Sequence, residues 1–85
     1  MEIEYSSHFD RAFKKLPDGI QVLAEKREAI FRADPFDSRL KTHKLHGKYA
    51  NFWSFSVDKK YRIVFRFVTK GKVVFLDADD HDLYR

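Results

Sequence analysis

Three runs of aromatic and β-branched residues fill the second half of the chain and constrain its fold more than any other feature. They cover residues 52–57, 61–68 and 72–78, and two short polar segments separate them. Aromatic and β-branched side chains favour extended backbone because they pack well on a pleated sheet, whereas short polar segments favour turns. The pattern therefore predicts three consecutive strands joined by two hairpins.

The alternation of side chains predicts how the first hairpin pairs. With residues 58–60 as a three-residue loop, Phe55 faces Ile63 and Trp53 faces Phe65, so one face of the sheet is wholly apolar. A two-residue loop would mix serines with these aromatic side chains. In the three-residue register, the other face carries Ser54, Ser56, Arg62, Val64 and Arg66.

The second turn is predicted at residues 69–71, because Gly71 suits the left-handed position at the end of a three-residue loop. This register pairs Phe65 with Phe75, Val64 with Leu76, and Arg62 with Ala78. The chain that follows the third strand then emerges beside Arg62. His81 and Tyr84 come soon after and are expected to reach the same face.

The first half of the chain predicts one strand and two helices. Residues 2–5 alternate polar and apolar side chains, as a short strand does. Ser6 or Ser7 offers an N-cap for a first helix, in which apolar residues recur at helical spacing. Pro17 ends that helix.

A second helix is predicted from Asp18, which can cap it, to Asp34, because the residue before a proline disfavours helix. Residues 36–50 are polar and basic and are predicted as a loop with a short extended piece around Leu45. The order is β-α-α-β-β-β in a single domain of residues 1–85. This is an α+β fold with an αα-hairpin packed on one face of a mainly antiparallel sheet.

Composition excludes several classes of protein. The chain has no cysteine, so no disulfide, thiolate zinc site or cysteine nucleophile is possible, which fits a reducing, cytoplasmic location. No apolar run approaches the roughly 18–20 residues of a membrane span, and no membrane partner is expected. Nine Phe, four Tyr and one Trp supply the buried area that an 85-residue chain otherwise lacks.

The positive charge of the chain is concentrated in one stretch. Residues 38–72 contain ten Lys or Arg and one acidic residue, a net charge of +9, whereas the rest of the chain has a net charge of −5. A local positive field suits a polyanion, either nucleic acid or an acidic protein. The alternative is a solvated, lysine-rich surface that has no specific partner.

Arg62 is the first candidate for chemistry. It stands in the middle of an otherwise apolar strand, and a guanidinium is costly to bury without a partner. Its planar fork suits a phosphate or a carboxylate. The alternative is a structural ion pair with Asp77, Asp79 or Asp80.

Three histidines are candidates for proton transfer, because imidazole titrates near neutral pH. His43 and His46 lie in the basic loop, and His81 lies in an acidic tail. His8, in the first helix, is expected to be an ordinary surface residue. A zinc site on the two loop histidines is a weak alternative, and neither a metal nor another cofactor is expected.

Two tyrosines are candidates for stacking on nucleotide bases. Tyr49 follows Lys48 in the basic loop, and Tyr84 stands near the end of the chain. Neither falls on the apolar face of the predicted sheet, so neither is needed to fill the core.

Five segments of the chain occur in an order that resembles a known family. They are IEYS at 3–6, FDRAFKKLP at 9–17, HKLHGKY at 43–49, YRIVF at 61–65 and HDLYR at 81–85. Together they resemble the RelE/ParE superfamily of toxins from type II toxin–antitoxin systems, and most closely its RelE/YafQ-type mRNA interferases. The resemblance implies a small sheet with two helices on one side and a basic, concave face on the other.

The resemblance also implies an activity: ribosome-dependent cleavage of mRNA in the A site, without metal, by attack of a ribose 2′-OH on the adjacent phosphate. By position, Arg62 would stabilise phosphate charge, His81 would transfer a proton and Tyr84 would position the substrate. His43 corresponds to a catalytic histidine of the YafQ-like branch. The residues expected to bind RNA are Lys41, Lys44, His46, Lys48, Tyr49, Lys59, Lys60 and Arg66.

The partners that the resemblance implies are a cognate antitoxin, the ribosome and mRNA, with operator DNA bound through the antitoxin in a hetero-oligomer. Two features depart from the family pattern. Ser54 and Ser56 stand where members often have Lys or His, and Lys60 replaces a YafQ-type aspartate. The partner of His81 in acid–base catalysis therefore stays open between a second histidine and a lysine.

Two other functions remain alternatives. A ParE-like inhibitor of DNA gyrase shares the same fold, so the fold alone does not separate it from a nuclease. A catalytically weak module that binds an antitoxin and acts as a co-repressor is the third possibility.

Overall fold

The computed structural model describes residues 1–80. In chain order the elements are β1 (Glu2–Tyr5), α1 (Ser7–Lys14), α2 (Asp18–Ala33), the 3-10 helix η1 (Ser38–Leu40), β2 (His43–Lys44), the 3-10 helix η2 (Gly47–Tyr49), β3 (Trp53–Ser56), β4 (Tyr61–Thr69) and β5 (Lys72–Asp80).

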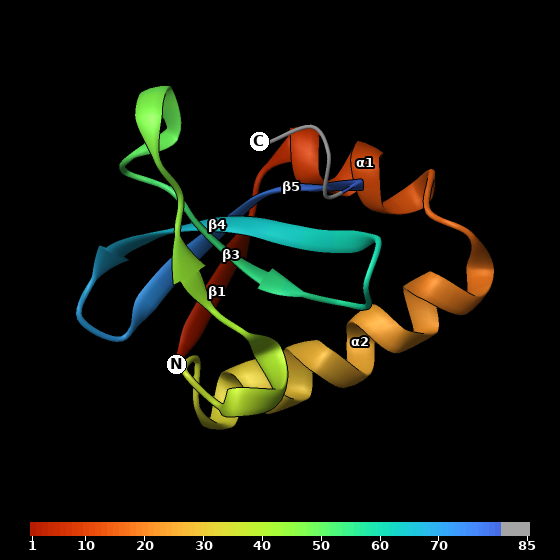
Figure 1. The fold of residues 1–85 in the computed structure, drawn as a ribbon, viewed down its shortest axis with the longest axis horizontal. Coiled ribbons are helices and arrows are strands. Elements are labelled where there is room, and N and C mark those ends of the chain that lie inside the picture. The colour runs from red at the N-terminus through yellow and green to blue at the C-terminus, as the bar shows by residue number, and fades with distance from the viewer. Residues whose placement is uncertain (81–85) are drawn as a thin grey trace.

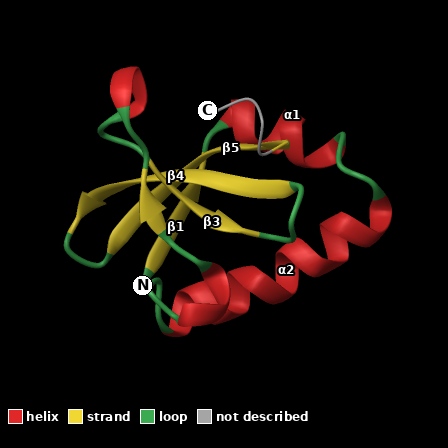
Figure 2. Ribbon diagram, viewed as in Figure 1, coloured by secondary structure: helices red, strands yellow, loops and turns green. Residues whose placement is uncertain are grey.

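The strands form one sheet in the order β1-β5-β4-β3-β2. β1 is parallel to β5, and the other neighbouring strands are antiparallel. In Figure 1, α1 lies beside the end of β5, and α2 runs along the lower side of the sheet. Figure 2 shows the same layers, with the helices red and the strands yellow. The predicted α+β fold, with two helices packed on a mainly antiparallel sheet, is confirmed.

Strand β2 differs from the prediction. The sequence indicates a short extended piece around Leu45, whereas the strand is His43–Lys44 and pairs with Ser54 and Trp53 of β3. Leu45 follows it directly, and its amide donates to the carbonyl of Phe52 at 2.9 Å. A two-residue strand is too short to show the alternation by which strands are recognised in a sequence.

The helices begin at the predicted residues. Ser6 caps α1, because its Oγ accepts a hydrogen bond from the amide of Phe9 at 3.0 Å. Pro17 precedes α2, and Asp18 is the first helical residue rather than a side-chain cap. Asp34 ends the helix in an extended conformation, as a residue before proline favours.

A cluster of four phenylalanines forms the centre of the core. Phe31 of α2 stacks on Phe55 with ring centroids 4.8 Å apart, and it meets Phe65 and Phe75 edge-on at 4.9 and 5.5 Å. All four side chains are fully buried. The three strands that supply these rings are therefore held to α2 by one continuous aromatic contact.

The predicted pairing of the first hairpin is confirmed. Trp53 pairs with Phe65, Phe55 pairs with Ile63, and the amide of Val57 donates to the carbonyl of Tyr61 at 3.0 Å. The side chains of this ladder separate into an aromatic face and a second face, as the alternation requires. The second face carries Ser54, Ser56, Arg62 and Val64.

The predicted pairing of the second hairpin is right in its middle and wrong at both ends. The turn is one residue shorter than predicted, because Thr69 belongs to β4 and pairs with Lys72, with a register shift between Phe67 and Thr69. Gly71 has a φ of 85° and Phe65 pairs with Phe75, as expected. A β-bulge at Leu76 then shifts the register by one residue, so that Arg62 pairs with Asp79 instead of Ala78. The regular register would place Asp77 beside Ile63 on the aromatic face, and the bulge places Ala78 there.

Replacing Phe31 with alanine should lower the free energy of unfolding by about 3–5 kcal/mol, because the substitution leaves a cavity among three other rings. Val22→Ala on the same helix is the matched control, since Val22 is 56% exposed. It should change the free energy by less than about 0.5 kcal/mol. Urea unfolding followed by circular dichroism measures both. Equal effects of the two substitutions would show that Phe31 does not hold the core together.

Candidate functional site

The ladder places Arg62 on the face of the sheet opposite the aromatic core. It pairs with Ser56 on β3 and Asp79 on β5, while the next residue, Ile63, belongs to the core. Arg62 is only 4% exposed. The guanidinium is therefore held inside the protein, at the position for which the sequence weighs phosphate binding against a structural ion pair.

Apolar residues explain why this second face is closed at its centre. Leu45, Val64 and Val74 are buried, although none of them belongs to the main core cluster. The hydroxyl of Ser54 is buried on the same face and makes no hydrogen bond within residues 1–80. A cation in such surroundings acts more strongly on a nearby anion than a cation in water does, because little solvent screens it.

The pairing puts His43 on the same face as Arg62, two strands away. β2 sets His43 opposite Ser54, and Ser54 lies opposite Val64 of β4. The exposed imidazole has its Nδ1 2.9 Å from the carbonyl oxygen of Lys41. In the tautomer that donates this hydrogen bond, Nε2 is the acceptor and faces outward as a base.

The residues around η2 form an arm that projects from the sheet (Figure 1). His46 and Lys48 are exposed on it, and Tyr49 is half-buried. Lys48 Nζ lies 5.3 Å from the centre of the Tyr49 ring, and this ring lies 6.1 Å from that of Phe52. Tyr49 thus contacts both the fold and a cation, and its ring is only partly available for stacking.

The remaining predicted RNA-binding residues lie elsewhere. Lys59 and Lys60 are exposed in the turn after β3, at the opposite end of that strand from the arm. Lys60 Nζ lies 3.9 Å from Asp80 Oδ2. Arg66 is exposed on the Arg62 face. Lys44 pairs with Trp53 and so lies on the other face.

The predicted residues therefore fall into two groups instead of one patch. The group near the arm contains His43, Lys44, His46, Lys48, Tyr49 and Arg66, and the group near the β3–β4 turn contains Lys41, Lys59, Lys60 and Arg62.

His81 and Tyr84 lie outside the described residues. Their predicted approach to Arg62 depends on a pairing of Arg62 with Ala78, and that pairing is wrong. Their roles stay predictions.

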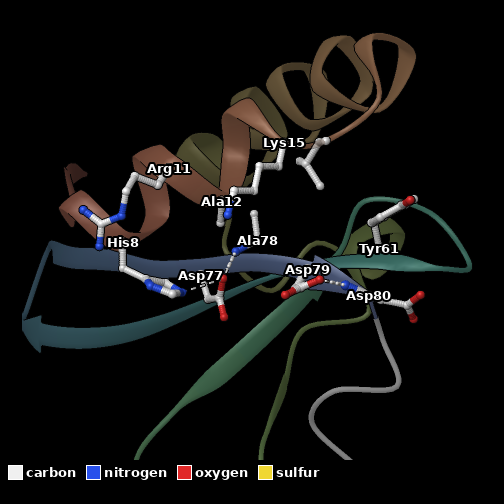
Figure 3. A pocket seen from close by; sticks show the side chains of 10 residues that line it. His8, Arg11, Ala12, Lys15, Tyr61, Asp77, Ala78, Asp79 and Asp80 are labelled. Carbon is white, nitrogen blue, oxygen red and sulfur yellow. Dashed lines mark hydrogen bonds and ion pairs between the residues drawn. The ribbon is translucent and has the colours of Figure 1, made fainter.

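A pocket of about 370 Å³ between α1 and β5 brings together residues that the sequence does not indicate as a site (Figure 3). His8 Nε2 lies 3.2 Å from Asp77 Oδ1, and Arg11 of the same helix and Lys15 at its C-cap also line the pocket. His8 is exposed, as predicted, but Asp77 is buried. The spacing 8, 11 and 15 puts these three cationic or imidazole side chains on one side of α1, which is the signal that could have indicated the pocket.

The carboxylates of this pocket also have a structural role. Asp77 Oδ1 accepts a hydrogen bond from the amide of Ala78 at 2.8 Å, and Asp79 Oδ1 accepts one from Asp80 at 2.7 Å. β1 pairs only with the first part of β5, so these amides lie beyond its end. The aspartates satisfy edge amides that would otherwise be open to another strand.

No helix in residues 1–80 has the length and apolar character needed to cross a membrane. Within the same residues, no three His, Cys, Asp or Glu side chains gather as metal ligands.

The clearest electrostatic perturbation lies beside the β3–β4 group. Asp37 accepts hydrogen bonds from the Arg39 side chain at 2.9 and 3.0 Å and from the Arg39 amide at 2.9 Å. These bonds, first of all those from the guanidinium, lower the pKa of Asp37 to about 2. The pair fixes η1 and orients the chain that leads to Lys41.

Comparison with known proteins shows which fold this is. The structure superposes on a YoeB/ParE toxin from Agrobacterium tumefaciens with a TM-score of 0.78 and 16% identity, covering 95% of this chain and 99% of the other. It superposes on YafQ from E. coli with a TM-score of 0.71 and 17% identity, over 96% and 94% of the two chains. The RelBE2 toxin–antitoxin complex of Mycobacterium tuberculosis gives a TM-score of 0.69 and 20% identity, over 94% and 96%.

The chain therefore has the RelE/ParE toxin fold over nearly its whole length, and the resemblance seen in the sequence is confirmed at the level of the fold. No protein-family model matches the sequence. No curated protein matches it either.

The pKa of Asp37 should be about 2 when it is followed by NMR titration of the side-chain carboxyl carbon. Because the folded-state value lies below the ordinary 3.8, the pair stabilises the fold above about pH 4, and this contribution is lost as the pH falls towards 2. Arg39→Gln removes the guanidinium and should return the pKa towards 3.8. An unchanged pKa in this variant would contradict the assigned cause.

Proposed function

We propose that this protein is the toxin of a toxin–antitoxin pair and a ribosome-dependent mRNA endoribonuclease. The observation that carries the proposal is the position of Arg62, a buried cation on the second face of a RelE/ParE toxin fold. Solved structures named as YafQ and RelE toxins share this fold. His43 lies on the same face by strand pairing, which gives the site a base as well as a cation.

The proposed reaction is a phosphoryl transfer from the 5′ oxygen to the 2′ oxygen, and it needs no oxidant or reductant. A base takes the proton of the ribose 2′-OH, and the 2′ oxygen attacks the adjacent phosphorus. The bond from phosphorus to the 5′ oxygen breaks, and an acid protonates that oxygen. The products are a 2′,3′-cyclic phosphate and a free 5′-OH. Both proton transfers fall to side chains, so the proposal requires no metal.

Each proposed residue has one role in this reaction. Arg62 stabilises the negative charge that grows on the phosphate oxygens, and its burial strengthens that effect. His81 is the proposed acid and His43 the proposed base, with Tyr84 placing the substrate. The exposed lysines and Arg66 hold the RNA backbone of the message or of the ribosome.

The proposed partner is a cognate antitoxin. Three of the structural neighbours are complexes named as RelBE2, RelE-RelB and DinJ-YafQ. An acidic segment of such a partner would cover the basic stretch 38–72, and the resulting hetero-oligomer would bind operator DNA through the antitoxin. The proposed location is the cytoplasm.

A second candidate function is inhibition of DNA gyrase. One structural neighbour is named as a YoeB/ParE toxin, and the buried Ser54 stands on the second face in place of a catalytic cation. This candidate and the non-catalytic module both predict that ribosome-bound mRNA stays intact.

Arg62→Ala and His81→Ala should each abolish growth inhibition while the antitoxin still binds. Cleavage by programmed ribosomes, measured by mapping the mRNA ends, should fall about 10²–10³-fold without Arg62 and about 10²–10⁴-fold without His81. Arg62→Lys is a second variant for the buried position, since it keeps a charge and most of the volume but loses the planar fork.

The controls separate the three functions. The wild-type protein should cleave mRNA only when ribosomes are present and should leave gyrase supercoiling unchanged. Loss of supercoiling with intact mRNA would support the gyrase inhibitor, and neither effect would support the non-catalytic module. Full toxicity in both alanine variants would reject the proposed mechanism.

A further inference from the structure

A second pocket, of about 470 Å³, lies at the open edge of β3. α2 contributes Arg27 to its wall, the segment after η1 contributes Lys41, and the β3–β4 turn contributes Lys59. Ser56 closes it on the side of the sheet. Within residues 1–80, β2 pairs only with Ser54 and Trp53, so no strand of this part of the chain pairs with β3 where the pocket lies.

Arg39 also lines this pocket and is ion-paired with Asp37, whereas the other three cations are available for an external anion. Arg27 Nε donates to the carbonyl of Val57 at 3.3 Å, which fixes the side chain without neutralising its charge. Neither it nor Lys41 or Lys59 makes an ion pair within residues 1–80. Asp58 is the acidic residue in the wall, and its Oδ1 accepts hydrogen bonds from the amides of Lys60 and Tyr61 at 2.8 and 2.7 Å.

The backbone of Lys41 gives an independent observation. Its φ of 51° and ψ of 40° put it in the left-handed region, where side chains with a Cβ atom are disfavoured. Among residues 1–80, the other residues with positive φ are glycines. Glycine at 41 would remove this strain, so a lysine here indicates that its side chain is needed.

The pocket is one strand away from Arg62. Ser56 pairs with Arg62 across the β3–β4 ladder, and paired residues of antiparallel strands have Cα atoms about 4.5–5.5 Å apart. A nucleic-acid strand that crosses the sheet from Arg62 towards the edge of β3 reaches the pocket next. Cations with a nearby hydroxyl and no apolar base platform suit a phosphate group.

We infer that this pocket binds a backbone phosphate of an RNA strand that also passes Arg62. The inference rests on the proposed function and adds to it a second phosphate site, to which Arg27 of α2 contributes. Because no base edge is read there, binding is independent of nucleotide sequence and depends on salt. The RNA can be the message or ribosomal RNA, and both offer the same phosphate chemistry.

The test uses the full 85-residue chain and a fluorescent hexauridylate or hexaadenylate RNA. Lys41→Gln/Lys59→Gln should weaken binding of both RNAs by the same factor, about three- to tenfold at low salt. The dependence of log affinity on log salt concentration should become shallower by about 1. Lys14→Gln/Lys26→Gln, with the same change in net charge on exposed helical positions, should leave both quantities unchanged.

Lys41→Gly separates a binding role from a structural one. The substitution relieves the left-handed strain, so the melting temperature should rise. RNA affinity should fall in the same direction as in the double glutamine variant, because the charge of Lys41 is lost. A fall in affinity that accompanies a fall in melting temperature would assign Lys41 a structural role and overturn its part in the site.

Binding assays identify the source of the RNA, and a separate mRNA-cleavage assay tests the proposed function. Weaker binding of the double variant to vacant ribosomes, with unchanged binding to the hexanucleotides, would assign ribosomal RNA. If the double variant binds both the vacant ribosomes and the hexanucleotides as tightly as the wild type does, the inference is overturned, whether or not mRNA is cleaved.

A different outcome is that the double variant loses binding to polyglutamate while its RNA binding is unchanged. That result would assign the pocket to an acidic protein segment and would also overturn the inference. If RNA binding falls as expected but wild-type protein cleaves no mRNA, the phosphate site stands and the nuclease proposal fails.

Discussion

The pairing of β4 with β5 is the interaction on which the rest of the structure depends. These are the two longest strands, each of nine residues, and they lie next to each other in the sheet. β1 joins the sheet only through β5, and β3 joins it only through β4. The ladder also carries Phe65 and Phe75 on one face and Arg62 on the other. A change in its register would therefore alter both the core and the candidate site.

The bulge at Leu76 reconciles two requirements within this ladder. The strand has to supply apolar side chains to the core near its start, and it has to supply aspartates near its end. In a regular strand Asp77 would share the aromatic face with Phe75, which would bury a carboxylate among rings. One extra residue moves Asp77 towards His8 and sets Asp79 beside Arg62. Bulges are frequent beside functional sites for this reason, because they redirect side chains without ending the sheet.

The sequence predicts the parts of this structure that depend on long, regular patterns. The two helices, the Ser6 cap of α1 and the first hairpin follow from periodicity and from local capping, which act within a few residues. The expected Asp18 cap of α2 does not form. The two-residue strand β2 carries no such pattern, because its pairing with β3 depends on the strands already formed. The bulge could have been inferred from Asp77, since regular alternation would put that carboxylate beside Ile63. The candidate site is predicted less completely, because the ion pair of His8 with Asp77, and the pocket that Arg27, Lys41 and Lys59 line together, join segments far apart in the sequence.

The separation of the basic residues into two groups changes what the charge of residues 38–72 means. A single patch would bind any polyanion that touches it, and its effect would depend only on the total charge. Here β3 lies between the arm at one end and the pocket at the other, with the buried Arg62 on the neighbouring strand. A flexible single strand can follow such a path, bending from one group to the next, whereas a stiff duplex cannot. The RNA strand that we propose as a partner fits this path, and because Arg62 is buried, a phosphate of that strand has to reach below the surface to meet the guanidinium.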